Sequence, residues 1–471
     1  MLDSLLAFIE ASPSPYHAAV AAVDRLRAAG FAETERSASW RGLDAARGIV
    51  MRDGGTVVAV RTAQRVDPDR LRFGVIGAHT DSPNLRLRPQ PDAIAYGYRQ
   101  LRVEVYGGAL LNSWLDRDLG LSGRVVLRGG DGVVPRHDRP ASDVRASELA
   151  DRGSTAVLWR SDRPLLRVPQ LAIHLDREAN DGLTLNRQQH LTPVWGLDER
   201  SANEPTGSEA KAGEPEASEP RASRPSAGGF REFLADELDV EPDAVLAWDI
   251  MAHDLAAPTR LGRDGEMYAA GRIDNLASCH AAVAALSGLG SPPDHTAAVV
   301  VLFDHEEIGS DSATGAGSPM LSDALERIAG WLGADREQYL RAAARSVCAS
   351  ADGAHAVHPN YPERHEPGHV PLLNGGPVIK SNANVRYATD ARTGARFIAA
   401  CEAASVPYQL YSHRGDLPCG TTIGPITASR LGMSVVDVGS PQLSMHSARE
   451  LGGSDDPAML TAALTAFLAD A

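Results

Sequence analysis

Residues 73–83 of the chain read FGVIGAHTDSP, an apolar run that ends abruptly in polar residues. The run Phe73–Ala78 is nearly all apolar, as expected of a strand that is buried on both faces of a sheet. His79 and Asp81 follow at once, at the strand end where open α/β sheets place their ligands. The stretch therefore predicts a sheet covered on both faces, with a site at its carboxyl edge.

Alternating helix and strand patterns lie on both sides of this stretch. The apolar periodicity predicts two helices within residues 3–29, strands at 48–51, 56–60, 296–303 and 434–438, and helices at 276–289, 319–332, 336–346 and 456–470. Alternation of this kind favours a mostly parallel central sheet with helices on both faces. The predicted fold class is therefore α/β.

The pattern changes from about Pro89, where short β-type runs alternate with clusters of Gly, Asp and Arg. We therefore expect an α/β domain built from residues 1–88 and 248–471, interrupted by a β-rich insertion at residues 89–247. Within the insertion, Ser201–Gly229 consists almost entirely of Glu, Pro, Ala, Ser and Gly. Such a composition buries too little apolar area to offset chain entropy, which predicts a disordered surface loop.

Composition and charge exclude several classes of protein. The formal net charge of −15 argues against nucleic acid and anionic membrane surfaces as main partners. The four cysteines form no CxxC pair, so neither a disulfide framework nor a thiolate zinc site is expected. Acids stand where a secretory signal has basic residues, and no apolar run approaches the roughly 20 residues that span a bilayer. We therefore expect a soluble, cytoplasmic protein.

Carboxylates and histidines recur in five segments: GAHTDSP (77–83), GRIDN (271–275), DHEEIGS (304–310), SADGAHAVHP (350–359) and LSMHSARE (443–450). In extended chain Asp81 points the same way as His79, so it is placed to hydrogen-bond the far ring nitrogen. The adjacent acids Glu306 and Glu307 repel each other and are costly to desolvate unless a cation is present. Each segment alone is also explained as solvated surface chain, whereas the five together predict a metal site.

Longer motifs extend this pattern over most of the chain. They are SPSPYHAA (12–19), GAHTDSP (77–83), YGGALLNSWLDRDLGLSGRV (106–125), LAIHLDR (171–177), RIDNLAS (272–278), LFDHEEIGS (302–310), SADGAHAVHPNY (350–361), PVIKSNANVRYAT (377–389), PCGTTIGP (418–425) and DVGSPQLSMHSARE (437–450). In sequence and order they resemble the aspartyl aminopeptidase family of dinuclear zinc exopeptidases. The clearest departure is Ser201–Gly229, which looks like an expansion within the insertion.

The resemblance implies two zinc ions, with Mn²⁺ or Co²⁺ as alternatives because oxygen-rich sites accept all three. His79 and Asp352 would bind one ion, Glu307 and His446 would bind the other, and Asp274 would bridge both. Two metals about 3.5–4 Å apart can activate a water and polarise the scissile carbonyl.

The resemblance also implies catalytic roles for residues that bind no metal. Glu306 would be the general base, taking a proton from the attacking water and passing it to the leaving amine. Asp81 would orient a metal ligand, as the spacing already predicts. His358 is a candidate for stabilising the oxyanion on the tetrahedral carbon; a packed loop histidine is the competing explanation.

Relatives in this family prefer peptides with an amino-terminal Asp or Glu, so a positive group is expected in the pocket. Lys380 matches the family position and is one of only two lysines in the chain, the other being Lys211 in the low-complexity tract. A chance surface lysine remains the alternative. Arg386 is a second candidate for binding the same substrates.

Family members form tetrahedral dodecamers in which the insertion mediates contacts. By resemblance His174, in the LAIHL run, would reach the active site of a neighbouring subunit, so we expect a homo-oligomer with a dimerisation-type insertion. From the residues alone, His174 is a histidine in an apolar strand, which is more often a core residue.

Two alternatives remain open at this point. One is a related dinuclear aminopeptidase with neutral specificity, such as a leucine-type enzyme. The other is a non-catalytic oligomeric scaffold that keeps the fold. The competent residues at every ligand position and at Glu306 favour the enzyme.

Overall fold

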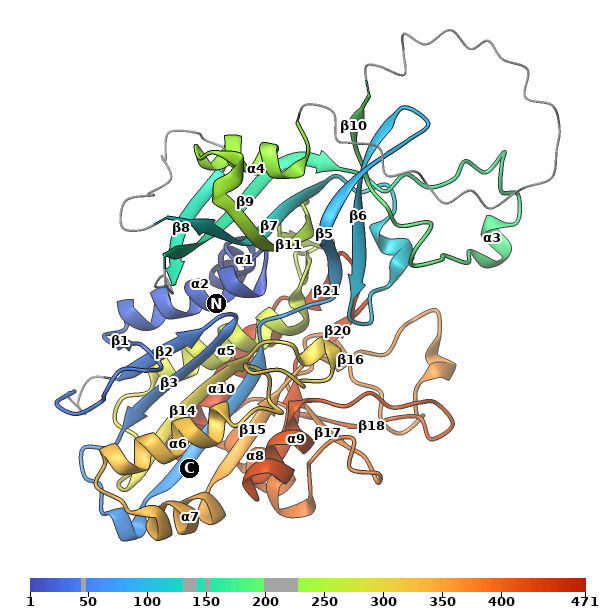
Figure 1. The fold of residues 1–471 in the computed structure, drawn as a ribbon. Coiled ribbons are helices and arrows are strands. Elements are labelled where there is room, and N and C mark those ends of the chain that lie inside the picture. The colour runs from blue at the N-terminus through green and yellow to red at the C-terminus, as the bar shows by residue number, and fades with distance from the viewer. Residues whose placement is uncertain (44–47, 130–141, 149–152, 199–227) are drawn as a thin grey trace, which may run out of the picture. The chain divides into compact units, whose positions relative to one another are not determined.

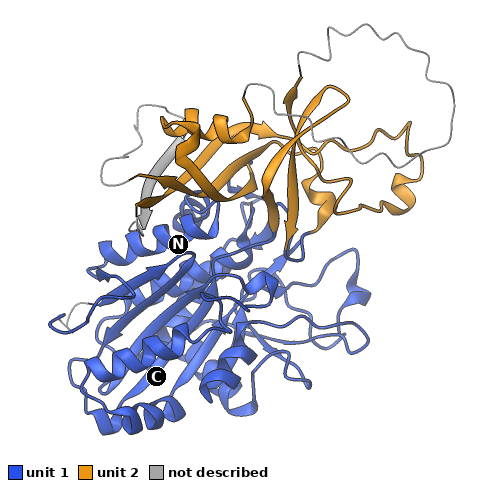
Figure 2. Cartoon of the chain, viewed as in Figure 1, with its two compact units in different colours: residues 1–83, 107–109, 256–471 blue, residues 84–106, 110–255 orange. Residues whose placement is uncertain are grey.

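The structure, a computed structural model, describes residues 1–43, 48–129, 142–148, 153–198 and 228–471 (Figure 1). The chain forms two compact units (Figure 2), the first of residues 1–83, 107–109 and 256–471, the second of residues 84–106 and 110–255. The divisions expected at residues 88–89 and 247–248 fall inside strands β5 (Asn84–Ala95) and β11 (Val245–Asp254). Most of the tract predicted to be disordered lies outside the described residues.

A nine-stranded sheet forms the centre of the first unit. In spatial order its strands are β1 (Ala32–Thr34), β2 (Ile49–Asp53), β3 (Thr56–Thr62), β14 (Thr296–Phe303), β4 (Arg72–His79), β15 (Val347–Ala351), β19 (Ser434–Gly439), β17 (Val378–Ser381) and β18 (Gln409–Ser412). The four strands β14, β4, β15 and β19 pair in parallel. On either side of them, β3 and β17 pair antiparallel to β14 and β19. The described sheet thus contains both parallel and antiparallel pairs. For example, β2 and β3 form an antiparallel hairpin, because so short a connection cannot join parallel strands.

Helices cover both faces of this sheet. Among the described helices, none is long and apolar enough to cross a membrane. Packed against one face are α1 (Leu2–Glu10), α2 (Pro15–Ala28), α5 (Ile273–Gly288), α8 (Ala391–Ala403) and α10 (Asp456–Ala469); against the other are α6 (Met320–Trp331), α7 (Arg336–Arg345) and α9 (Ile423–Leu431). Val300 and Leu302 of β14 join the first core, and Val299 and Val301 join the second. Because both faces are buried, the strand is apolar throughout, and each such side chain contributes about 1.5–3 kcal/mol.

A five-stranded sheet in the same unit was not predicted, because its strands are too short to show a period. In spatial order they are β12 (Thr259–Leu261), β13 (Met267–Ala270), β21 (Glu450–Gly453), β20 (Pro441–Leu443) and β16 (Ala354–His355). This small sheet matters for function because β13 and β20 lead directly into two of the five polar segments.

The second unit contains a seven-stranded sheet whose pairs are all antiparallel, as expected for a β-rich insertion. Its spatial order is β10 (Val194–Leu197), β6 (Tyr98–Tyr106), β5, β11, β7 (Leu119–Arg128), β9 (Ser154–Leu166) and β8 (Ser142–Glu148), and its described helices are α3 (Ala179–Gly182) and α4 (Phe230–Leu238). Aromatic rings tie α4 to the sheet: Phe230 lies 5.5 Å from Trp248 between ring centroids, and Phe233 lies 6.1 Å from Trp159.

Candidate metal centre

Three adjacent parallel strands of the first unit deliver polar residues to one edge of the sheet. His79 is the last residue of β4, and Asp352 directly follows β15. Glu306 and Glu307 lie in the short 3-10 turn Glu306–Ile308 just beyond β14. Because parallel neighbours end at the same edge, the strand order brings these residues together.

Two further residues reach the same cluster from the small sheet. Asp274 lies at the start of α5, shortly after β13, and His446 lies in the turn between β20 and β21. His446 has a φ of 68°, and Arg272 and His305, next to the polar residues, have φ of 59° and 66°. The left-handed backbone costs L-residues about 1–2 kcal/mol each, and such strain gathers at functional sites.

Of three groups of ligand-type atoms among the described residues, two share Asp274, and the third consists of His79, Glu306 and Glu307. His79 Nε2 lies 3.4 Å from Asp274 Oδ1 and 3.4 Å from Asp352 Oδ1. His446 Nε2 lies 3.4 Å from Asp274 Oδ2 and 3.4 Å from Glu307 Oε2. Within each group the atoms lie within 4.8 Å of one another. One carboxylate oxygen of Asp274 therefore faces each of the two groups that share it.

Both imidazoles present Nε2 to the carboxylates because their Nδ1 atoms are already engaged. His79 Nδ1 donates to the carbonyl oxygen of Asp81 at 3.0 Å, and His446 Nδ1 donates to that of Gly108 at 3.1 Å. In a neutral imidazole this fixes the tautomer and leaves the Nε2 lone pair facing carboxylate oxygens. Lone pairs that face one another repel unless a proton or a metal cation lies between them.

Glu306 and Glu307 are also costly to keep ionised in this cluster. Burial raises the pKa of Glu306 to about 8, and the negative charge of Asp352 adds to the effect. Burial also raises the pKa of Glu307 well above its usual range, and Glu307 Oε1 is buried without a hydrogen-bond partner among the described residues. A divalent cation would lower this cost because it stabilises the ionised acids.

These imidazole nitrogens and carboxylate oxygens are a ligand set typical of zinc, and Mn²⁺ and Co²⁺ accept similar ligands. The residues present therefore fit a pair of divalent metal ions.

Asp81 supports the cluster differently from the sequence prediction. Its carboxylate oxygen lies 3.5 Å from His79 Nδ1, whereas its main-chain carbonyl is the closer acceptor. The carboxylate instead accepts the main-chain N–H groups of Glu306 and Glu307, each at 3.1 Å. After His79 the chain bends, so that the Asp81 carbonyl meets the His79 ring. The Asp81 carboxylate therefore holds the turn that carries Glu306 and Glu307.

Glu450 was not assigned a role from the sequence, although it closes the fifth polar segment. It is only 2% exposed, and its carboxylate accepts the main-chain N–H groups of Asp274 at 3.0 Å and His446 at 2.7 Å. Burial raises its pKa to about 8. The signal in the sequence is its spacing of four residues from His446, and that spacing alone does not predict which groups its carboxylate contacts.

Lys380 is not the surface lysine that the sequence left as an alternative, because it is 2% exposed within β17. Its Nζ donates to the carbonyl oxygens of Asp352 at 3.1 Å and Gly353 at 3.0 Å, and lies 3.5 Å from Asp352 Oδ2. The ammonium also lies 5.1 Å from the ring centroid of Tyr387. A buried positive charge thus stands directly behind one of the candidate metal ligands.

A cavity of about 270 Å³ lies beside the segments that carry Asp352 and His446. Its lining includes His355, His358, Arg364, His365, Tyr411, His413, Gln442 and Met445. Gln442 Nε2 and His413 Nε2 are buried and lack hydrogen-bond partners among the described residues. Polar atoms that are buried without partners cost about 1–3 kcal/mol each, so the cavity is suited to a ligand that accepts hydrogen bonds.

His358 is half-buried in the wall of this cavity, with its ring 4.9 Å from that of Tyr361. Its Nδ1 accepts the main-chain N–H of Asn360 at 3.2 Å, which leaves Nε2 as the ring nitrogen able to donate. It therefore faces a cavity and is not enclosed in the protein core.

Two sequence candidates are not members of the cluster. Arg386 is exposed, and its described hydrogen bonds involve main-chain atoms, with Asn382 and Thr421 as partners. His174 belongs to the second unit, and the expectation of a buried strand there is wrong: the run 171–175 is exposed and forms turns, with Leu175 N donating to Ala172 O at 2.8 Å. Apolar residues alternate in this run, but its main chain forms a local turn hydrogen bond and does not pair with another strand.

Comparison with known proteins agrees with this geometry. The family model for the aminopeptidase I zinc metalloproteases (M18) matches residues 8–142 and 144–468. A probable M18 family aminopeptidase 2 of Streptomyces avermitilis is 46% identical over 469 residues, covering 99% of this chain and 97% of the relative.

Solved structures with the same fold support the assignment. A chain in the solved complex of Ape4 and Nbr1 is 33% identical, with a TM-score of 0.87 over 100% of this chain and 85% of that chain. A more distant match, the mApe1 dodecamer of S. cerevesiae, is 23% identical with a TM-score of 0.76, covering 99% of this chain and 95% of that one. With a shared fold, nearly full-length identity above 40% and a cluster of metal-ligand residues, the chain belongs to the M18 family of aminopeptidases, which are zinc metalloproteases.

Proposed function

We propose that this aminopeptidase removes amino-terminal Asp and Glu residues from peptides at a pair of metal ions. In this proposal His79 and Asp352 hold one ion, Glu307 and His446 hold the other, and Asp274 binds both. The observation that carries it is the division of the Asp274 carboxylate, which turns one oxygen toward each group at 3.4 Å. A single carboxylate between two imidazoles is what a shared ligand requires.

Glu306 is the proposed general base. Zinc, when bound at such a pair, supplies a water of lowered pKa and polarises the substrate carbonyl. Glu306 Oε2 lies 4.0 Å from His79 Nε2, and its main chain is held by Asp81. The carboxylate is therefore fixed beside the cluster, where it takes a proton from the attacking water and returns it to the leaving amine.

Acidic specificity is the next part of the proposal. The protein has a formal net charge of −15 and repels acidic peptides at long range, so a local positive group must offset that repulsion. Lys380 supplies a buried positive charge, and the neighbouring cavity offers Gln442 Nε2 and Arg364 as donors. Carboxylates accept such charge-assisted hydrogen bonds. Arg386 remains an outer candidate for the same substrates, and His358 remains the candidate for the oxyanion.

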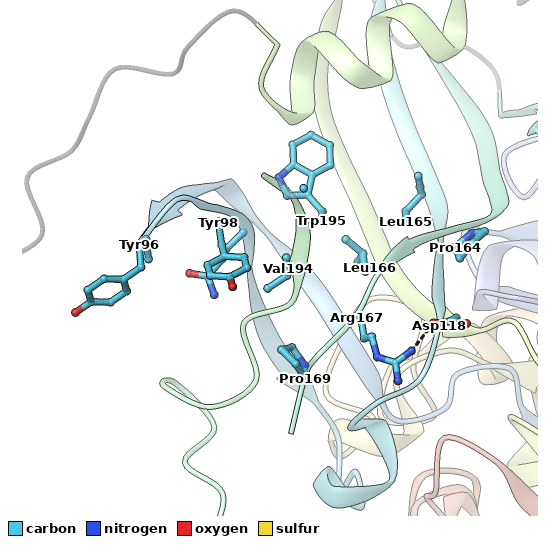
Figure 3. Close-up of a pocket in the computed structure, with 13 residues that line it drawn as sticks. Tyr96, Tyr98, Asp118, Pro164, Leu165, Leu166, Arg167, Pro169, Val194 and Trp195 are labelled. Carbon is cyan, nitrogen blue, oxygen red and sulfur yellow. Dashed lines mark hydrogen bonds and ion pairs between the residues drawn. The ribbon is translucent and has the colours of Figure 1, made fainter. Parts of the chain in front are cut away.

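We further propose a homo-oligomer assembled through the second unit, and the dodecamer of the distant mApe1 relative makes a tetrahedral dodecamer the first arrangement to test. Leu171, Ile173 and Leu175 flank His174 and are 56%, 46% and 75% exposed. A cavity of about 710 Å³ lies in the same unit, and the exposed rings of Tyr96 and Tyr98 are among its lining (Figure 3). Exposed apolar surface of this kind marks protein contacts. In the assembly, His174 would contact the active site of a neighbouring subunit.

The compartment is proposed from the cysteines. All four are free, three of them buried, which suits a reducing compartment such as the cytoplasm.

The decisive experiment is hydrolysis of Asp-, Glu-, Leu- and Ala-anilides, each with and without a chelator, alongside native mass. We expect rapid cleavage of the Asp and Glu substrates, loss of activity with the chelator, recovery with zinc or manganese, and a mass of several subunits. Faster turnover of the Leu substrate would favour the neutral aminopeptidase. A stable metal-free oligomer that stays inactive after zinc and manganese are added would favour the non-catalytic scaffold.

A further inference from the structure

Glu450 couples two of the candidate metal ligands through a single side chain. Its Oε2 accepts the N–H of Asp274 at 3.0 Å, and its Oε1 accepts the N–H of His446 at 2.7 Å. The two ligands are 172 positions apart in the sequence (446 − 274), and neither N–H belongs to a regular helix or sheet ladder. One buried carboxylate therefore replaces the hydrogen bonds that secondary structure would otherwise provide.

The small sheet explains how Glu450 reaches both ligands. Glu450 opens β21 and is the pairing partner of Ala270, the last residue of β13, from which the chain continues to Asp274. The β20–β21 hairpin carries His446 in its turn. A Cβ on Gly271 would lie 2.9 Å from Ala448 O, so the two loops are in close contact.

The two candidate metal groups do not depend on Glu450 equally. His446 belongs to one group only, together with Glu307. In the other group, His79 is held by the Asp81 carbonyl, and Asp352 is held by Lys380 and by its own N–H bond to Val438 O at 2.8 Å. Asp274 has a second anchor, because its carbonyl accepts Ser82 Oγ at 2.5 Å. His446 also keeps a second anchor, its ring bond to Gly108 O. Glu450 nevertheless holds two of the three ligands in the group that contains His446 and only Asp274 in the other, so its loss falls most heavily on the former group.

We propose that Glu450 is a positioning residue that sets the geometry of the Glu307–His446 metal site, and hence the metal affinity of that site. This inference rests on the proposed two-metal function. If Glu450 had only a structural role, its replacement would lower folding stability and leave the metal affinities of the folded protein unchanged.

Asp456 provides a matched control within the same unit. It is also 2% exposed, and its carboxylate likewise accepts two main-chain N–H groups, those of Asn374 at 2.8 Å and Gly376 at 3.2 Å. Neither of these residues belongs to the metal cluster. Asp456→Asn therefore reproduces the loss of a buried carboxylate that accepts two main-chain N–H groups, without touching a candidate ligand.

The test titrates metal-free wild-type, Glu450→Gln and Asp456→Asn proteins with zinc against a chromogenic chelator, and records the absorption spectra of the cobalt-loaded forms. We expect two zinc ions in the wild type and in Asp456→Asn. In Glu450→Gln we expect one ion at unchanged affinity and the other about 10- to 100-fold weaker, as is typical of losing a residue that orients ligands. The cobalt spectrum should lose the contribution of one site.

Two unchanged affinities in Glu450→Gln, equal weakening of both sites, or the same selective loss in Asp456→Asn would each overturn the inference. If Glu450→Gln fails to fold, Glu450→Asp keeps the charge but withdraws the carboxylate by one methylene, and the same selective loss is expected. A wild type that binds no metal would instead refute the proposed function itself, so the two failures are distinguishable.

Discussion

The two compact units leave opposite kinds of group unsatisfied. The first unit buries acids with raised pKa values beside two imidazoles, and Glu307 Oε1 has no hydrogen-bond partner among the described residues. The second unit exposes a run of apolar side chains, Leu171, Ile173 and Leu175, at 56%, 46% and 75%, although the first unit also exposes apolar side chains such as Leu340. Buried charge is costly until an opposite charge arrives, and exposed apolar surface is costly until another surface covers it. The difference is what the proposed function requires, in which cations complete the first unit and another protein surface covers the second.

The largest expected effect follows from removing the proposed base. Glu306→Gln should lower kcat by about 10³-fold, because the amide cannot take a proton from the attacking water. The metal content should stay at the wild-type value, since Glu306 is not among the proposed ligands. Steady-state kinetics and metal analysis check both points, with the exposed acid Glu363→Gln as a control. A variant that keeps its turnover would exclude Glu306 as the base.

The next effect separates the adjacent acids. Glu307→Gln should weaken one metal site by about 100-fold or more, because a neutral amide replaces an ionised ligand, and losing even an outer partner of a ligand costs 10- to 100-fold. Chelator competition measures the affinity. Two ions bound as tightly as in the wild type would remove Glu307 from the ligand set, and the buried acids would then need another explanation.

Substrate preference tests the positive charge behind the cluster. Lys380→Met should lower kcat/KM for Asp and Glu substrates by roughly 10- to 100-fold, the equivalent of one charged hydrogen bond. Turnover of Ala and Leu substrates should change little. If all four substrates decline together, Lys380 acts by positioning Asp352, to which it already donates. The unfolding midpoint should be followed in parallel, because carbonyls of Asp352 and Gly353 lose a donor.

The second unit is tested by adding charge to its exposed apolar run. Leu175→Asp should weaken self-association by about tenfold or more, the value of burying one leucine side chain. Sedimentation or native mass measures the change, and Leu340→Asp, at a leucine that is 53% exposed in the first unit, serves as the control. An equal shift in both variants, or none in Leu175→Asp, would contradict assembly through residues 171–175.

The smallest expected effect is a pH dependence of stability. The pKa values of Glu306 and Glu450, raised to about 8 by burial, exceed their unfolded values, so the folded metal-free protein binds these protons more tightly than the unfolded chain does. His446, with its pKa raised to about 10 by Asp274 despite burial, acts in the same direction. Stability of the metal-free protein should therefore fall as pH rises from about 5 to 8, by a few degrees in Tm.

Zinc should abolish that decline, because bound cations favour the ionised acids. Thermal unfolding of the metal-free and zinc-loaded forms at pH 6 and pH 8 measures both trends. A metal-free protein that becomes more stable toward pH 8 would show that the buried acids are not strained by their charge.

Much of the fold followed from local patterns. The strand expected at residues 296–303 is β14, and the helices expected at 319–332 and 456–470 are α6 and α10 to within a residue at each end. The short strands of the small sheet were missed, because two to four residues carry no period. Apolar alternation predicts a strand at residues 171–175, where the chain forms turns, because the pattern does not indicate whether the main chain pairs with another strand.

The candidate site divides in the same way. Its ligand-type residues stood out in the sequence because acids and histidines at strand ends are chemically unusual there. Glu450, Gln442 and the cavity histidines His365 and His413 did not stand out, because their roles depend on neighbours far along the chain. The spacing predicts that the Asp81 carboxylate holds the ring of His79, but that carboxylate accepts the main-chain N–H groups of Glu306 and Glu307, and the ring donates to the Asp81 carbonyl.

By itself, then, the sequence determined which side chains are candidates for the chemistry and which segments form much of the sheet beneath them, since both depend on residue type and short-range spacing. Tertiary structure alone decided that Asp274 faces two imidazoles, that Lys380 stands behind Asp352, and that one buried glutamate clamps Asp274 and His446. The physical reason is that burial and hydrogen-bond partners arise from long-range packing. Nothing in the local sequence of Glu450 states that water will be excluded from it or which N–H groups will meet it.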